Sequence, residues 1–97
     1  MNVEIKGVHH DVDEETKELI NKKLRRLEHV SELIVDLIIT ITLEKQRYKI
    51  EATINFRWGN SSHIRVAGFD LFKGIDLLFD KLDNKIHKEK GRIQEKQ

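Results

Sequence analysis

Hydrophobic positions along the chain follow the two-residue period of a strand in some segments and the longer period of a helix in others. Residues 3–7 predict a short strand. Over residues 10–30, apolar positions recur every three or four residues, which predicts an amphipathic helix. Asp11 or Asp13 can cap its first turn through a side-chain oxygen. The expected buried face of this helix carries Thr16, Ile20, Leu24 and Leu27.

A strict two-residue alternation then runs through the middle of the chain and predicts strands over residues 33–43, 47–57 and 63–68. Only the segment EKQ separates the first two of these strands, so we expect them to form an antiparallel hairpin. The side chains expected to point inward are Val35, Leu37, Ile39, Ile41, Leu43, Tyr48, Ile50, Ala52, Ile54, Phe56, Ile64 and Val66.

Helical periodicity returns after Asp70, which is a good residue for a helix N-cap. An apolar stripe follows over about four turns. Gly74 lies inside this helix, where it costs about 0.8–1 kcal/mol relative to alanine. The expected stripe consists of Leu71, Phe72, Ile75, Leu78, Phe79, Leu82 and Ile86.

The predicted order of elements is therefore β-α-β-β-β-α, which is an α+β fold. Each strand has one apolar face and each helix has one apolar stripe. The economical arrangement is a four-stranded sheet with both helices packed on one face and the other face solvated. We expect a single domain of 97 residues, with residues 1–92 folded and residues 93–97 fraying.

Composition narrows the class of protein. The chain has 18 basic and 17 acidic residues and a formal net charge of +1, so a basic surface can arise only by segregation of charge. It contains no cysteine, which suits a reducing cytoplasm. No apolar run approaches the roughly 20 residues that a membrane-spanning helix needs. We therefore expect a cytoplasmic protein with no membrane partner.

The charges of the second helix are segregated around its axis. Taking Leu71 as the origin and about 100° per residue, acidic residues lie at about 120–180° and basic residues at about 260–320°. The acidic flank carries Asp76, Asp80 and Asp83. The basic flank carries Lys81, Lys85, Lys88 and Arg92. A solvated helix face with no partner usually mixes its signs, so this separation favours a polyanionic partner.

The first helix also concentrates its cations, with Lys22, Lys23, Arg25 and Arg26 within five positions. Cations late in a helix complement the helix dipole by about 0.3–1 kcal/mol each, which is an alternative explanation for both clusters. Dipole complementation explains placement along the axis but not around it. We therefore expect the basic flanks of the two helices to border a common groove that binds RNA phosphates and recognises folded RNA by shape.

Other chemistry finds little support. Ser61, Ser62 and His63 place hydroxyls beside an imidazole, but without a third catalytic member. No metal-binding spacing and no cofactor motif occurs. We expect a protein that is not an enzyme and that has no metal, cofactor or small-molecule substrate. Trp58 fits equally a contact with a partner and packing over the end of the sheet. An alternative function is a protein-interaction module that uses the exposed sheet face or an edge strand.

Four segments resemble one known family in the order in which that family has them. They are "IKGVHHDVDEETKE", "KKLRRLEH", "EATINF" and "FDLFKGIDLLFDKLDNKIHKEKGR". The last is similar to the "DMYxAIDxLxDKLxRQ" segment of ribosome hibernation-promoting factors and ribosome-associated inhibitors, also called sigma-54 modulation proteins. Phe72 stands where the family has tyrosine, and Asn84-Lys85 where it has Arg-Gln.

The resemblance implies a fold similar to double-stranded-RNA-binding domains, in a short family member or the N-terminal domain of a long one. It also implies binding to 16S rRNA of the 30S ribosomal subunit in the channel used by mRNA and tRNA. Translation would then be inhibited under stress or in stationary phase, with 70S or 100S ribosome assemblies as further possible partners. Family positions for RNA contact correspond to Lys23, Arg26, Lys81, Lys88, Lys90 and Arg92. The charge pattern adds Lys22, Arg25 and Lys85.

Overall fold

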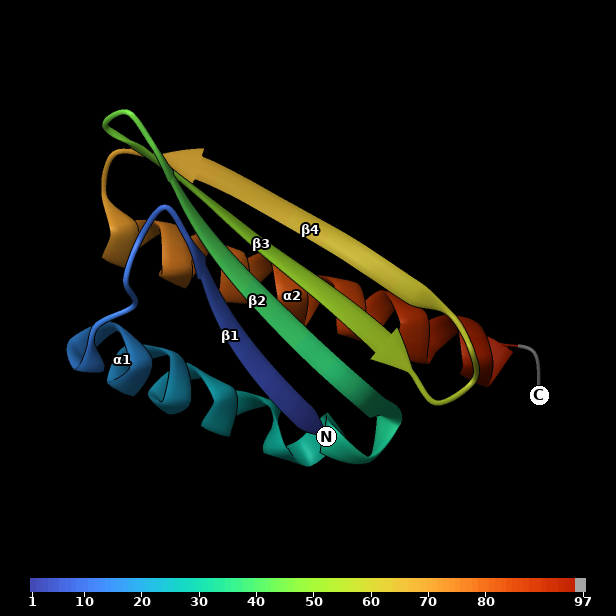
Figure 1. Ribbon diagram of the computed structural model, residues 1–97. Coiled ribbons are helices and arrows are strands. Elements are labelled where there is room, and N and C mark those ends of the chain that lie inside the picture. The colour runs from blue at the N-terminus through green and yellow to red at the C-terminus, as the bar shows by residue number, and fades with distance from the viewer. Residues whose placement is uncertain (96–97) are drawn as a thin grey trace.

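A four-stranded mixed sheet with helices on one face forms the structure, a computed structural model that describes the backbone of residues 1–95 and the side chains of residues 1–91 (Figure 1). The elements in order are β1 (Asn2–Val8), α1 (Glu14–Leu24), the 3₁₀ helix η1 (Arg25–Leu33), β2 (Ile34–Glu44), β3 (Arg47–Phe56), β4 (Ser61–Gly68) and α2 (Leu71–Glu95). The strand order is β1-β2-β3-β4, with β1 parallel to β2 and the other neighbours antiparallel. The predicted fold and the predicted hairpin are confirmed.

The hydrophobic core lies between the sheet and the two helices, which cover the same face (Figure 1). The opposite face of the sheet carries mainly polar side chains, among them Thr53, Arg65 and Lys49. The fully buried side chains that join the two layers include Ile20, Leu27, Leu37, Ile39, Ile41, Ile50, Ile54, Ile75, Leu78, Phe79 and Leu82. These positions match the predicted inward faces.

Two local irregularities depart from the predicted pattern. The first helix is α-helical only to Leu24 and continues as η1, in which each residue advances by about 120° instead of 100°. At the start of β2, a bulge lies between Ile34 and Asp36. Ile34 is therefore buried, while Val35 is 43% exposed, and the prediction that Val35 points inward is wrong.

The apolar stripe of α2 is narrower than predicted. Phe72 is 39% exposed, so its assignment to the core is wrong. Gly74 packs where the helix comes close to the sheet, because a Cβ at this position would lie 2.5 Å from Cδ1 of Ile50. The absence of a side chain at Gly74 therefore leaves room for the end of the Ile50 side chain.

Helix α2 extends into the C-terminal segment for which the sequence predicts fraying. The helix continues to Glu95, and so includes residues 93–95 of the segment that was expected to fray. Residues 96 and 97 lie outside the described part of the chain. No helix in the described residues is long and apolar enough to cross a membrane.

Replacing Gly7 with alanine should lower the free energy of unfolding by roughly 1–3 kcal/mol, because a Cβ there would overlap the backbone carbonyl of His10. Chemical denaturation of the purified variant measures this change. Gly68→Ala is the matched control, since no atom lies within 4 Å of its added Cβ. Equal stability losses in the two variants would contradict the packing seen at Gly7.

Asp13 caps α1 by accepting a hydrogen bond from the backbone N–H of Thr16 at 2.9 Å. Hydrogen bonding by Thr16, through its side chain and its backbone, lowers the pKa of Asp13 below its ordinary value of 3.8. Because the pKa of Asp13 is lower in the folded protein than in the unfolded chain, its ionised carboxylate stabilises the fold at pH values above 3.8. This contribution is lost as the pH falls from 3.8 through the folded-state pKa.

Asp13→Ala should therefore reduce stability at neutral pH, and the difference from the wild-type protein should shrink as the pH falls below 3.8. Thermal unfolding over a pH series measures this difference. A difference that stays constant down to the lowest pH at which both proteins fold would show that the charge of Asp13 plays no part.

Candidate nucleic-acid interface

The cations of the first helix are paired with the acidic flank of α2. The Lys23 Nζ lies 2.8 Å from Oδ1 of Asp76, and the Lys23 side chain is only 22% exposed. One Nη atom of Arg26 lies 3.6 Å from Asp80 and 3.8 Å from Asp83. The prediction of a groove shared by the basic flanks of both helices is therefore wrong.

The hand of the β1–α1–β2 connection decides which flank of α2 faces α1. α2 packs over β3 and β4, runs antiparallel to β4, and contacts α1 through its acidic flank. With β1 parallel and adjacent to β2, these relations require a left-handed connection. About 98% of such connections are right-handed, and that hand would have turned the basic flank toward α1.

The basic flank of α2 instead faces the edge strand β4. Lys81, Lys85 and Lys88 line a cleft of about 360 Å³ together with His63 and Arg65 of β4. Ile64 and Asn84 complete its lining. We call this cleft the α2–β4 groove.

The α2–β4 groove keeps most of its positive charge. Lys85 is offset by Glu89, whose carboxylate lies 3.6 Å away and is 5% exposed. Lys81 and Lys88 are exposed and form no ion pair with any carboxylate in the described part of the chain. Lys81, Lys88 and Arg65 therefore contribute three unneutralised cations to the lining of one groove. This is the arrangement that a phosphate backbone requires.

His63 is held at the rim of the groove by its cross-strand neighbours on β3. Its Nδ1 lies 3.0 Å from the Thr53 hydroxyl, and its Nε2 lies 3.3 Å from a carboxylate oxygen of Glu51. The carboxylate of Glu51 is thus engaged by His63, and Arg65, which lies opposite Glu51 in the sheet, forms no ion pair within the described residues. The hydrogen bonds of His63 run to Thr53 and Glu51 on β3.

The sequence predictions missed His63 and Arg65 as members of the site. Their two-residue spacing on the predicted fourth strand places both on the solvated face. That spacing was the available signal, but it reveals a groove only when the flank of α2 beside β4 is also known.

The remaining predicted residues are distributed over other surfaces. Lys22 and Arg25 are exposed where α1 passes into η1. Lys90 is exposed and lies at about 100° around α2, on the side of the acidic flank. The side chain of Arg92 lies outside the described residues. RNA contact by all nine predicted cations stays a prediction, and the structure brings together Lys81, Lys85 and Lys88.

Trp58 packs over the end of the sheet. Its ring stacks on Phe56 with centroids 4.8 Å apart and an angle of 13° between the planes. It belongs to the half-buried residues that pack against the core. Of the two interpretations left open by the sequence, the structure supports packing.

In the described part of the chain, no group of three or more His, Cys, Asp or Glu side chains is placed to hold a metal ion.

The fold is shared with solved structures of other proteins, over more than 90% of this chain in each case. A ribosomal subunit interface protein from Coxiella burnetii has the same fold, with a TM-score of 0.85 and 25% identity over 94% of this chain and 99% of that chain. The N-terminal domain of Protein Y from Thermus thermophilus superimposes with a TM-score of 0.77 at 19% identity, over 91% of this chain and 98% of that chain. The second likeness concerns the fold alone.

The sequence model of the family described as sigma 54 modulation protein / S30EA ribosomal protein matches residues 3–94. The chain belongs to this family. A ribosome hibernation promoting factor from Azotobacter vinelandii is 34% identical over 100% of this chain and 90% of its own length. The factor of the same name from Escherichia coli K12 is 26% identical over 98% of this chain and 99% of its own length.

The Lys23–Asp76 pair should stabilise the contact between α1 and α2, because it is partly shielded from solvent. A double-mutant cycle with Lys23→Ala and Asp76→Ala should give a coupling free energy of about 1 kcal/mol by chemical denaturation. Lys17 and Glu14 form an exposed pair at 3.6 Å and provide the control cycle, for which we expect about 0.3 kcal/mol. A coupling for Lys23–Asp76 no larger than that of the control would contradict the interface role.

Proposed function

We propose that this protein associates with the ribosome and binds the 30S subunit through phosphates of 16S rRNA that lie in the α2–β4 groove. The protein belongs to a non-enzymatic family whose curated members carry the name ribosome hibernation promoting factor. Its action is then binding and occlusion. A domain held in the channel for mRNA and tRNA excludes both and inhibits translation under stress or in stationary phase.

One observation carries the choice of surface. Lys81 and Lys88 are exposed, lie on the same flank of a long helix, and line the groove together with Arg65, without a neutralising carboxylate in the described residues. A rigid helix holds its cations at fixed spacing, so the surface can match phosphates of a folded RNA by position. The cations of the first helix are less suited to this role, because Lys23 and Arg26 are already engaged by aspartates.

The mechanism follows from these charges. RNA carries a dense array of phosphates, and each cation that neutralises one releases a condensed counterion. Association should therefore be fast, insensitive to base sequence and strongly dependent on salt. Specificity for the ribosome then comes from the shape of the folded rRNA that presents the phosphates.

Charge reversal of Lys81 and Lys88 together should weaken binding to purified 30S subunits by about tenfold or more, because two phosphate contacts become repulsive. Sedimentation with 30S and 50S subunits at two salt concentrations measures binding. The variant should also show a shallower dependence of affinity on salt than the wild-type protein.

The control for this experiment is the charge reversal of Lys6 and Lys17, which changes the net charge equally. These lysines lie on β1 and α1, away from the α2–β4 groove, and their side chains are 53% and 47% exposed. Equal losses in the two double variants would show that net charge, and not the groove, determines binding.

A further inference from the structure

A second basic cleft lies on the side of the sheet that faces away from the helices. It has a volume of about 580 Å³ and is formed at the β2–β3 turn and along β3 and β4. Its lining includes four cations and one carboxylate. The charged residues are Lys45, Arg47, Lys49, Arg65 and Glu44. We call it the sheet cleft.

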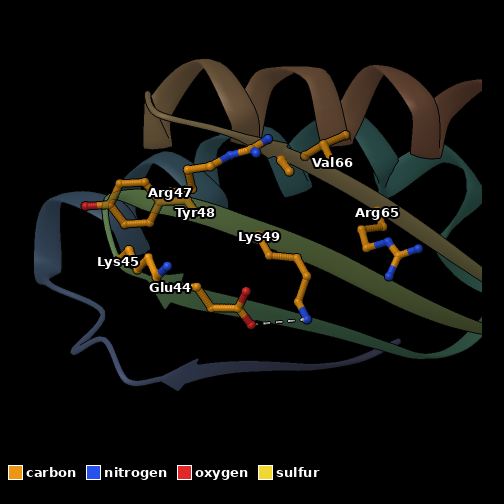
Figure 2. A pocket seen from close by; sticks show the side chains of 8 residues that line it. Glu44, Lys45, Arg47, Tyr48, Lys49, Arg65 and Val66 are labelled. Carbon is orange, nitrogen blue, oxygen red and sulfur yellow. Dashed lines mark ion pairs between the residues drawn. The ribbon is translucent and has the colours of Figure 1, made fainter.

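The cations of the sheet cleft are only weakly neutralised. The Lys49 Nζ lies 3.8 Å from Glu44, a long and exposed ion pair that contributes little (Figure 2). Figure 2 shows Lys49 and Arg65 projecting on the same side of the sheet. They are diagonal neighbours on adjacent strands, at about 7–8 Å between Cα atoms, so both can reach neighbouring phosphates of one strand.

Lys45 occupies a position that its residue type does not favour. It lies in the two-residue turn between β2 and β3 with φ of 57°, in the left-handed region where glycine or asparagine is usual. Turn geometry therefore does not explain a lysine here. A cation at the mouth of the sheet cleft does.

An aromatic side chain lies beside the cleft. Phe69 is 72% exposed, and the guanidinium carbon of Arg47 lies 5.5 Å from the centre of its ring. Figure 2 shows the Arg47 side chain extending from β3 toward β4, away from the Glu44–Lys49 pair. An exposed ring supported by a guanidinium is a platform on which an unpaired base can stack. A base inside a duplex cannot use such a platform.

We propose that the sheet cleft binds single-stranded RNA, with phosphates at Lys45, Lys49 and Arg65 and one base on Phe69. Arg65 lines both this cleft and the α2–β4 groove. The edge strand β4 therefore separates two RNA-binding surfaces that share one cation. The proposal relies on the proposed function only for its choice of RNA as the ligand.

The test uses an eight-nucleotide oligouridine labelled with fluorescein, with affinity measured by anisotropy at low salt. Lys45→Gly combined with Lys49→Gln should weaken binding about tenfold, since two phosphate contacts are lost. Lys6→Gln combined with Lys17→Gln removes the same charge elsewhere and should change affinity less than about twofold. Equal losses in both pairs would overturn the proposal.

Two single variants separate binding from stability. Lys45→Gly removes a cation and relieves the left-handed backbone, so RNA affinity should fall while the thermal midpoint stays the same or rises. Phe69→Ala should weaken oligouridine binding by about fivefold or more, with little effect on a blunt RNA duplex of eight base pairs. A loss of affinity in Phe69→Ala that is equal for single strand and duplex would refute the stacking role.

Amide chemical-shift mapping then locates the oligouridine. In the protein carrying Lys81→Glu and Lys88→Glu, shifts should still appear at residues 45–49 and 65–69. Shifts confined to the α2–β4 groove in the wild-type protein would overturn the cleft. This result is independent of 30S sedimentation, so the sheet cleft can fail while the proposed function stands, and the reverse.

Discussion

The packing of the first helix against the acidic flank of α2, where Lys23 and Arg26 pair with aspartates, leaves the basic flank of α2 on the surface. Lys23 and Arg26 bring together two helices that would each carry an excess of one sign along that side. Because the acidic flank of α2 is used internally, its basic flank is left for solvent and for a partner. A protein with a formal net charge of +1 thus presents a concentrated positive surface at one edge of its sheet.

The same arrangement explains the crowding of cations at Lys22–Arg26. Four positive charges within five positions repel one another on an isolated helix by roughly 0.2–0.5 kcal/mol for each close pair. In the folded protein, the aspartates of α2 offset this repulsion for Lys23 and Arg26. These cations are structural in the first instance, whereas Lys81 and Lys88 have no such partner in the described chain.

The edge strand β4 connects the two basic surfaces. Its solvated side chains alternate with buried ones, so His63 and Arg65 stand between α2 and the outer face of the sheet. Arg65 is available to both surfaces because Glu51, its neighbour on β3, is engaged by His63. His63 thus occupies the carboxylate of Glu51, with which Arg65 could otherwise form an ion pair.

The sequence by itself determined the order of elements, the faces of the strands and the separation of charge around α2, because all three depend on local periodicity. Val35 escaped these rules because a bulge turns it toward solvent, and Phe72 escaped them because it lies in the first turn of α2, where it is 39% exposed. Only the tertiary structure decided which flank of α2 faces α1 and which faces β4. The reason is that the hand of the β1–α1–β2 connection relates two faces of the molecule that no local pattern links, and here it is the rare left hand.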